Sequence, residues 1–315
     1  MKNARILVTG GLGFVGQALV YRLIKDGNHI RILDNLTSAS ITSEAAEEMG
    51  AEVIVGDIID IKACRKAVEG RDVLVHLAAQ TYVAKSVAQP NNDLQINAIG
   101  SLNLLEACRD AGVGVVVAAS SNAVAGTHPP PFNETALTKP LSPYGCSKLA
   151  MESYLHAYAH THGIRTVALR FANVYGPGSW RKGSVVASFI RSMLSGQGIT
   201  IYGDGLQTRD FLHIDDIVNA VVSALDAGAK GSCFCIGSGT RTEIVDLAER
   251  LVVLAEGTPG ANTQVHYAPP RIGDIKDNWS EIDLAQRKLG FRPTVELNRG
   301  LRQTYDWFVK HTAAK

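Results

Sequence analysis

The chain has little net charge and no long hydrophobic run. Its 31 lysines and arginines nearly balance 30 aspartates and glutamates, which gives a formal net charge of +1. Such a balance provides no basic surface of the kind that holds nucleic acid or an anionic membrane. No apolar run approaches the roughly 20 residues needed to cross a bilayer. We therefore expect a soluble globular protein with neither a nucleic-acid partner nor a membrane partner.

Cysteine is also scarce, and histidine shows no metal-ligand spacing. The five cysteines are odd in number and lie in apolar or helical contexts, which indicates free thiols in a reducing compartment. Cys233 and Cys235 would share one face of a strand. They are either a metal or redox pair or small buried packing groups. We expect no metal site, and the absence of a signal-peptide pattern after Met1 predicts a cytoplasmic protein.

Short apolar runs alternate with helical stretches in the first half of the chain. Continuous runs rich in Val, Ile, Leu and Ala are typical of strands buried on both faces. Helical spacing of apolar residues between them predicts an α/β fold with a doubly wound parallel sheet of the Rossmann type. The runs expected to be strands are residues 4–10, 29–34, 51–57, 72–79, 113–120 and 165–170.

The rhythm changes after Arg170, which predicts two parts. We expect residues 1–170 to form a dinucleotide-binding Rossmann domain. Residues 171–315 would form mainly a smaller α/β substrate lobe, with some segments returning to the Rossmann sheet. The Pro- and Gly-rich stretch 256–274 is expected to be a long surface connection.

A glycine-rich turn marks the first junction between strand and helix. Gly10, Gly13 and Gly16 would allow a tight turn and close approach of a pyrophosphate to the helix N-terminus. Asp34 follows Gly16 by 18 residues (34 − 16) and ends the second strand, where a carboxylate binds the ribose and repels a 2′-phosphate. Asp57 could accept from the adenine amine. The alternatives are an ordinary strand–helix turn and a turn-forming Asp-Asn, but together these features favour NAD over NADP.

Tyr144 and Lys148 stand four residues apart at the start of an expected helix, so they share one face. A tyrosine with an unperturbed pKa near 10 is a poor base at neutral pH. An adjacent ammonium and a nicotinamide cation would lower the pKa of Tyr144. A helix N-terminus with a solvated lysine is the alternative interpretation of this spacing.

Short motifs follow one another in a characteristic order along almost the whole chain. They are TGGLGFVG (9–16), LDNL (33–36), GDI (56–58), HLAA (76–79), NAIG (97–100), YGCSK (144–148), RFANVYGP (170–177), IYGDGLQTRDF (201–211) and RIGD (271–274). In them the chain resembles the extended short-chain dehydrogenases/reductases, in particular the NAD-dependent nucleotide-sugar epimerase/dehydratase family with its UDP-glucose/UDP-galactose 4-epimerase-like members. The resemblance implies NAD as cofactor, a nucleotide sugar as substrate, and a homodimer that packs helices at about 91–111 and 144–162 into a four-helix bundle.

The resemblance also implies roles for individual residues. Ser121, Tyr144 and Lys148 would be catalytic, with Ser121 relaying a proton between the sugar 4-hydroxyl and Tyr144. Asn97 would support the active-site helix and a water near Lys148. Contacts with the nucleotide sugar would come from Ser121, Asn173, Tyr202, Arg209, Arg271 and Asp274, although each arginine taken alone also fits a surface ion pair. Cofactor contacts would come from Gly10, Gly13, Phe14, Val15, Gly16, Asp34, Asn35, Asp57, Ile58, Leu77, Ala78, Ala79, Asn97, Ala119, Tyr144 and Lys148.

The residues after Ser121 separate the reactions of this family. Its dehydratases carry an Asp-Glu pair directly after the hydroxyl, and this chain has Asn122 and Ala123. Neither side chain titrates usefully. The family's usual tyrosine is also replaced by Ala125, which with Ala123 would leave a roomy sugar pocket. We expect an NAD-dependent 4-epimerase that acts on a nucleotide sugar, with a UDP-hexose as its substrate. A reductase, dehydrogenase or dehydratase of the same family, or a non-catalytic NAD-binding protein, are the alternatives.

Overall fold

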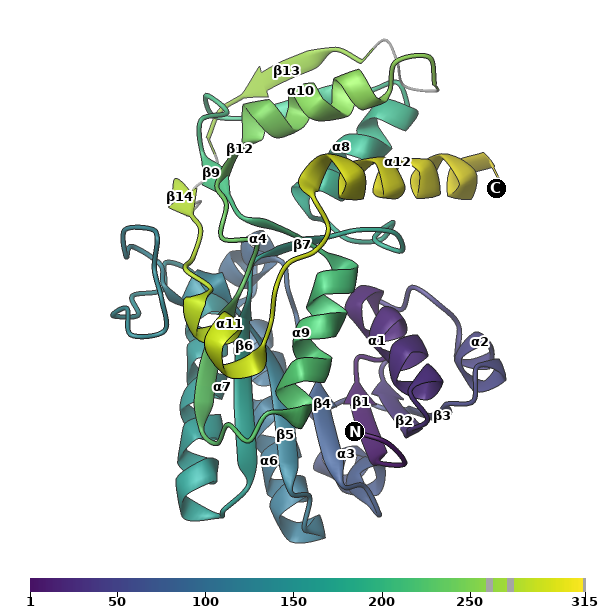
Figure 1. The fold of residues 1–315 in the computed structure, drawn as a ribbon, viewed down its shortest axis with the longest axis vertical. Coiled ribbons are helices and arrows are strands. Elements are labelled where there is room, and N and C mark those ends of the chain that lie inside the picture. Colours follow the sequence, from purple (N-terminus) through teal and green to yellow (C-terminus); the bar gives the residue numbers. More distant parts are fainter. Residues whose placement is uncertain (259–262, 271–274, 314–315) are drawn as a thin grey trace.

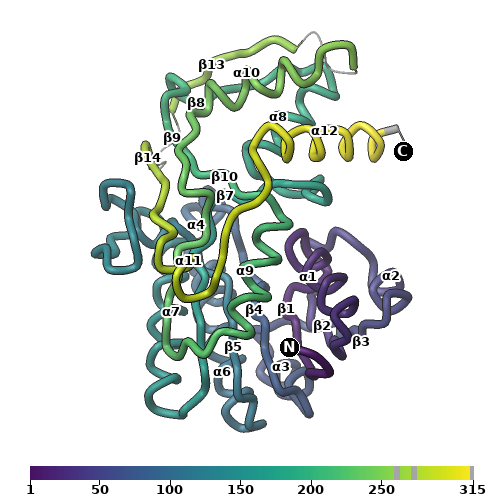
Figure 2. The backbone as a smooth tube through the Cα atoms, viewed as in Figure 1, coloured from purple at the N-terminus to yellow at the C-terminus, as the bar shows by residue number. Residues whose placement is uncertain are grey.

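The computed structural model describes residues 1–258, 263–270 and 275–313, and its centre is a seven-stranded parallel sheet (Figures 1 and 2). The strand order is β11-β6-β5-β4-β1-β2-β3. The order reverses between β1 and β4, which is the switch point where doubly wound sheets bind ligands. The predicted Rossmann fold is therefore confirmed. The strands are β1 (Arg5–Thr9), β2 (His29–Asp34), β3 (Glu52–Val55), β4 (Val73–His76), β5 (Val115–Ser121), β6 (Arg165–Phe171) and β11 (Ser232–Ile236).

Helices cover both faces of this sheet because its strands alternate buried side chains between two cores. On β1, Ile6 and Val8 belong to one hydrophobic cluster and Leu7 to the other. The first cluster is closed by α1 (Phe14–Lys25), α9 (Ile214–Asp226) and α11 (Asp283–Leu289), with the short α2 (Ser43–Glu48) at its margin. The second is closed by α3 (Ile61–Val68), α6 (Gly100–Ala111) and α7 (Pro143–Thr161).

The second half of the chain contributes to both parts of the molecule. Its segments α9, β11 and α11 pack on the Rossmann sheet. A separate cluster that includes Phe189, Leu247 and Tyr305 holds together α8 (Val185–Leu194), β8 (Ile199–Tyr202), α10 (Ile244–Leu254) and α12 (Leu297–Ala313). With β13 (Val265–Ala268), which pairs with β8, they lie above the sheet in Figure 1. We call this part the C-terminal lobe.

The prediction that residues 256–274 form only a surface connection is wrong in its described part, because β13 lies there and pairs in parallel with β8. The Pro and Gly residues around it concealed a short edge strand of four residues.

Two further small sheets join the lobe to the Rossmann sheet. They are β7 (Asn173–Tyr175) with β10 (Phe211–His213), and β9 (Thr208–Arg209) with β12 (Thr242–Glu243) and β14 (Asp277–Asn278).

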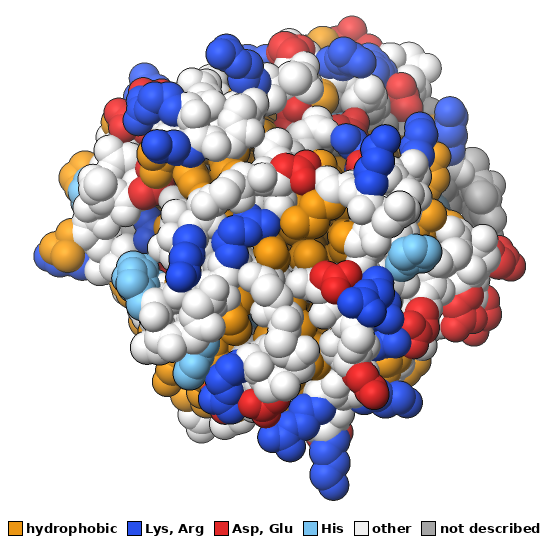
Figure 3. Space-filling view, turned by 60° about the horizontal axis from the view of Figure 1, so that its bottom comes forward, with side chains coloured by type: hydrophobic (Ala, Val, Ile, Leu, Met, Phe, Trp, Pro, Cys, Tyr) orange, Lys and Arg blue, Asp and Glu red, His pale blue; other side chains and the backbone are white. Residues whose placement is uncertain are grey.

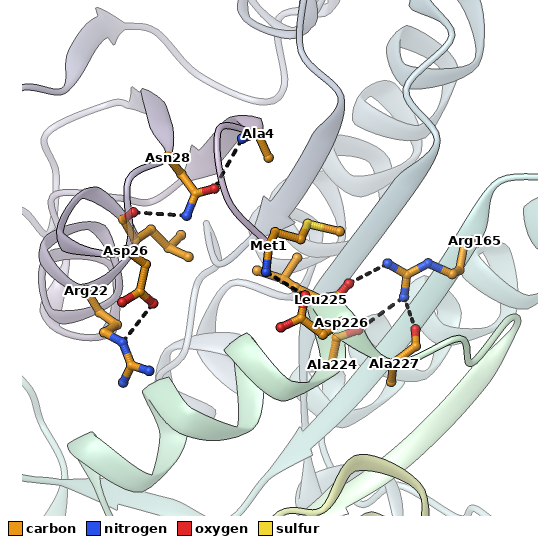
Figure 4. A network of polar contacts seen from close by, with 11 residues as sticks. Met1, Ala4, Arg22, Asp26, Asn28, Arg165, Ala224, Leu225, Asp226 and Ala227 are labelled. Carbon is orange, nitrogen blue, oxygen red and sulfur yellow. Dashed lines mark hydrogen bonds and ion pairs between the residues drawn. The ribbon is translucent and has the colours of Figure 1, made fainter.

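Polar contacts fix the end of α9 against the sheet (Figure 4). Arg165, the first residue of β6, donates from Nη2 to the Leu225 carbonyl at 2.6 Å and from Nη1 to the carbonyls of Ala224 and Ala227. The amino terminus of Met1 forms an ion pair with Asp226 at 2.6 Å. The arginine satisfies carbonyl groups at the helix end that have no partner within the helix, and the amino terminus pairs with a side-chain carboxylate there.

The remaining helical segments lead into α6 and α7. They are α4 (Val83–Ala88), α5 (Pro90–Leu94), the π-helical turn η1 (Gln95–Ile99) and the 3₁₀ turn η2 (Asn122–Val124).

Among the described residues, no helix is both long and apolar enough to cross a membrane. The face of the molecule seen in Figure 3 mixes basic and acidic side chains around a small hydrophobic area, in keeping with the balanced charge of the chain.

Candidate active site

A cavity of about 470 Å³ lies where the carboxyl ends of the sheet strands face the C-terminal lobe. It brings together residues that the sequence predicted from six separate stretches, although they are far apart along the chain. The predicted residues that line it are Val15, Leu77, Ala79, Ala119, Ser121, Tyr144, Lys148, Asn173, Tyr202 and Arg209.

The glycine turn between β1 and α1 leaves no room for side chains. Gly10 has a φ of +69°, which favours glycine. A Cβ at Gly16 would overlap the Gly10 carbonyl oxygen and the backbone of Gly11. Gly13 is the N-cap of α1, and no side chain caps that helix. The backbone N–H groups of the first turn, which includes Phe14 and Val15, therefore have no side-chain partner and fit a phosphate group.

The polar residues at the ends of β2 and β3 lie together. Asp34 accepts from the N–H groups of Leu12 (3.1 Å) and Leu36 (2.9 Å), so its carboxylate is joined to the glycine turn. Asn35 donates to an Asp57 carboxylate oxygen at 2.8 Å. Each carboxylate oxygen can accept more than one hydrogen bond. The set therefore fits a ribose and an adenine, and the residues present fit a dinucleotide.

The three residues predicted to be catalytic come from β5 and the first turns of α7. Lys148 is 3% exposed and donates from Nζ to the Ala119 carbonyl at 2.9 Å. Ser121 accepts from the Ala123 N–H at 3.2 Å and hydrogen-bonds Tyr144. Tyr144 is 8% exposed. The side chains of a hydroxyl, a phenol and an ammonium thus converge on one wall of the cavity.

The protein's own groups raise the pKa of Tyr144, while the predicted lowering, which also needs the nicotinamide cation beside the phenol, stays a prediction. Burial raises the pKa of the phenol, and the negative charge of Asp93 acts in the same direction, while the hydrogen bond with Ser121 opposes them. Lys148 directs its ammonium at a backbone carbonyl. Burial lowers the pKa of Lys148 to about 8, although Asp93 and Glu152 partly offset it. Desolvation therefore dominates both groups.

A buried polar network supports the start of α7. Asp93 is 1% exposed and accepts from Ser147 Oγ at 2.6 Å, Gln80 Nε2 at 2.8 Å and Asn97 Nδ2 at 3.1 Å. Asn97 also exchanges hydrogen bonds with the backbone of Gln80 and donates to Ser147. Because Ser147 lies between Tyr144 and Lys148 on α7, the network fixes that turn of the helix. The structure places Asn97 here, outside the cavity lining.

A buried ion pair lies one turn further along α7. Glu152 accepts from Arg170 Nε at 3.0 Å, from Arg170 Nη2 at 2.8 Å and from Ser120 Oγ at 2.5 Å. The side chains of Glu152 and Arg170 are 8% and 6% exposed. The pair joins α7 to β5 and β6 directly beside Ser121. Sequence reasoning missed it, although Glu152 repeats the spacing of Tyr144 and Lys148 by another four residues.

Other predicted residues lie at or beyond the margin of the cavity. Ile58 is 4% exposed and packs in the core against Gly100, and the backbone of Ala78 contacts the position where a Gly10 Cβ would stand. Arg209 donates from Nη1 to the carbonyls of Thr208 (2.7 Å) and Lys276 (3.2 Å) while lining the cavity. The predicted residues Arg271 and Asp274 lie outside the described residues.

The positions after Ser121 present no acid or base. Asn122 is buried and donates to Ser280 at 3.4 Å, and Ala123 lines the cavity. Ala125 does not line the cavity, contrary to expectation, because it packs in a small cluster with Phe132 and Cys235.

Burial raises the pKa values of both Cys233 and Cys235. Both thiols are therefore held in their neutral form.

Comparisons with known proteins agree with this geometry. A model of the NAD dependent epimerase/dehydratase family matches residues 6–237. A UDP-glucose 4-epimerase of Mycolicibacterium smegmatis is 37% identical over 311 residues, which cover 96% of this chain and 98% of that protein. A dTDP-glucose 4,6-dehydratase of Streptomyces niveus is 31% identical over 98% of this chain and 94% of its own length. The crystal structure of a UDP-glucose 4-epimerase from Thermotoga maritima with UDP-glucose matches with a TM-score of 0.91 and 36% identity, over 98% of this chain and 99% of that chain.

The chain therefore belongs to the NAD-dependent epimerase/dehydratase family. The resemblance inferred from the motifs is confirmed, and so is the prediction of NAD as cofactor. The relatives include both epimerases and a dehydratase. Family membership thus fixes the class of enzyme and leaves the reaction to the residues around the sugar.

Proposed function

We propose that this protein inverts the hydroxyl group at C4 of a UDP-hexose by way of a 4-keto intermediate. The names of the relatives support UDP as the nucleotide and epimerisation at C4 as the reaction. Ser121 and Tyr144 would carry the proton of the 4-hydroxyl, with Lys148 one turn away to favour the phenolate. When bound, NAD supplies a hydride acceptor and a positively charged ring.

The lining of the cavity carries this proposal. Within the described part of the chain, its lining contains the cations Lys148, Lys182 and Arg209 and no aspartate or glutamate. Elimination of water from a 4-keto sugar needs an acid and a base besides the groups that oxidise C4. Epimerisation needs only the proton carrier and the cofactor: the C4 hydride would pass to the cofactor and, after the keto sugar rotates, return to the opposite face while the proton goes back to the oxygen. A cavity with cations and without carboxylates suits a diphosphate-bearing substrate and the simpler reaction.

The test is incubation of the purified protein with a panel of UDP-hexoses, with the products separated as 4-epimers. We expect interconversion of a pair of 4-epimers without net formation of NADH. Tyr144→Phe keeps the ring packing and removes the proton carrier, so turnover should fall about a hundredfold or more. Stoichiometric NADH would instead identify a dehydrogenase, and a 4-keto-6-deoxy product would identify a dehydratase. Parent-rate epimerisation by a folded, NAD-loaded Tyr144→Phe protein would contradict the mechanism.

We also propose that the protein is a homodimer that associates through α5, η1, α6 and α7. Large hydrophobic side chains on these segments and on α4 are exposed in the single chain and would be covered by a second copy. They include Val87 (53% exposed), Leu94 (47%), Ile99 (38%) and Tyr154 (42%). Sedimentation of the parent should give the mass of two chains, and Leu94→Glu should shift it toward one. A monomeric parent would contradict this assignment.

A further inference from the structure

Residues 176–184, which we call the bridging segment, connect the C-terminal lobe with the Rossmann sheet across the cavity. On the lobe side, the Trp180 ring packs on Phe308 of α12 with centroids 5.2 Å apart. Arg191 of α8 donates from Nη1 to the carbonyls of Trp180 (2.5 Å) and Lys182 (2.9 Å). The backbone of the segment is therefore held by two helices of the lobe.

The same segment contacts the Rossmann side at three places. Arg181 donates to the Ala39 carbonyl at 2.9 Å, and the Tyr82 hydroxyl donates to the Arg181 carbonyl at 3.1 Å. A Cβ at Gly178 would overlap the amide of Gln17 on α1. The segment is thus fitted closely against α1 and against the loop after β4, on both sides of the glycine turn.

Lys182 is the residue that this segment presents to the cofactor site. Its Nζ lies 5.1 Å from the ring centroid of Phe14, the first residue of α1, and its side chain lines the cavity together with Val15. Among the described residues it forms no ion pair. Burial lowers the pKa of Lys182 to about 8, and no nearby carboxylate offsets the effect. An amine held in such a position is stabilised by an anion.

The neighbouring features indicate which anion this is. Two groups near Lys182 already favour a phosphate, namely the uncapped first turn of α1 and the glycine turn that precedes it. Arg209, the cation expected to hold the substrate diphosphate, comes instead from β9, next to Gln207 and the carbonyl of Tyr202. The two cations therefore reach the cavity from different segments, and Lys182 is the one placed against α1.

We propose that Lys182 binds the diphosphate of NAD together with the first turn of α1. The bridging segment then holds the cofactor between the sheet and the C-terminal lobe, and the cofactor leaves slowly during turnover. This inference rests on NAD as cofactor and is independent of which sugar the enzyme converts.

The test is the rate at which labelled NAD replaces the NAD bound to the purified holoenzyme, measured without any sugar. Lys182→Met removes one charge-assisted contact, so exchange should accelerate by roughly 10- to 100-fold. Lys182→Arg keeps the charge and should exchange within about threefold of the parent. Lys25→Met, an exposed lysine at the other end of α1, controls for net charge and should match the parent.

Binding of UDP to the same NAD-loaded variants separates the two possible roles of Lys182. We expect UDP affinity to be unchanged in Lys182→Met. An unchanged NAD exchange rate with weaker UDP binding would assign the lysine to the substrate and overturn the proposal. The proposal would also be overturned if NAD exchanged as fast in Lys182→Arg as in Lys182→Met, or as fast in Lys25→Met as in Lys182→Met. Loss of both NAD and UDP binding would indicate a collapsed cavity wall and would also overturn it.

Discussion

Replacing Glu152 with glutamine would remove the charge that neutralises Arg170 and keep the size of the side chain. Two hydrogen bonds from the guanidinium and one from Ser120 converge on this carboxylate. Within the part of the chain that the structure describes, Arg170 Nη1 already has no hydrogen-bond partner. The guanidinium of Arg170 would therefore have few other groups to pair with once the negative charge of Glu152 is removed. Removal of one partner from a buried pair destabilises the native state by about 3–5 kcal/mol.

The assay is thermal unfolding of each variant at the same saturating NAD concentration, because a ligand that binds only the native state raises the transition temperature. A loss of about 3–5 kcal/mol corresponds to roughly 6–10 °C in a chain of this size. Asp246→Asn breaks an exposed pair with Arg250 of similar geometry and should cost less than about 1 kcal/mol. Activity should also change, because the Glu152 charge raises the pKa of Lys148.

A double variant, Glu152→Leu with Arg170→Met, distinguishes a lost charge partner from a lost packing group. Both buried charges are then absent, so most of the stability lost in Glu152→Gln should return. The reasoning would be refuted if Glu152→Gln melted within about 2 °C of the parent. It would equally be refuted if the double variant regained no stability and unfolded about 3–5 kcal/mol more easily than Glu152→Gln.

Three further predictions address the two ligand sites. Arg209→Ala should weaken UDP binding by about 1.5–3 kcal/mol and leave NAD exchange unchanged; unchanged titration of UDP would exclude Arg209 from the substrate site. Gly16→Ala should destabilise the protein by about 1–3 kcal/mol and reduce co-purified NAD, because the new Cβ overlaps the Gly10 carbonyl; Gly114→Ala, with nothing within 4 Å of its Cβ, is the matched control. An anion favours the charged form of Lys182, whose pKa is lowered to about 8 before the anion binds, so NAD affinity should fall as the pH rises above about 8, and this fall should be absent in Lys182→Met.

The sequence predicted the sheet well because its strands are buried on both faces. The run of β4, for example, is buried at all four of its positions, and such runs stand out from the helical spacing around them. The edge strand β13 has exposed residues at three of its four positions. Its pairing with β8 depends on where the C-terminal lobe places it, and no local pattern carries that information.

The candidate site was predictable to the extent that short motifs mark backbone requirements. The glycine turn is such a case, because Gly16 is fixed by the Gly10 carbonyl only a few residues away. The resemblance implied that Asn97 supports α7, where it donates to Ser147. The contribution of Asp93 was missed because its hydrogen bond with Ser147 joins residues 54 positions apart. The effect of burial on the Tyr144 pKa was missed for a related reason, since burial is a property of the folded chain.

The path of the chain between the two parts of the molecule restricts how such a protein can be divided. A fragment that stopped at Arg170 would lack β11, α9 and α11. The hydrophobic residues of α1 and β6 in the first core would then face water, and β6 would become an unprotected sheet edge. The Rossmann portion therefore does not exist as a module that recombination could transfer alone. An exchange of substrate-binding residues between relatives would have to keep the crossing segments, whichever side of the cavity those residues come from.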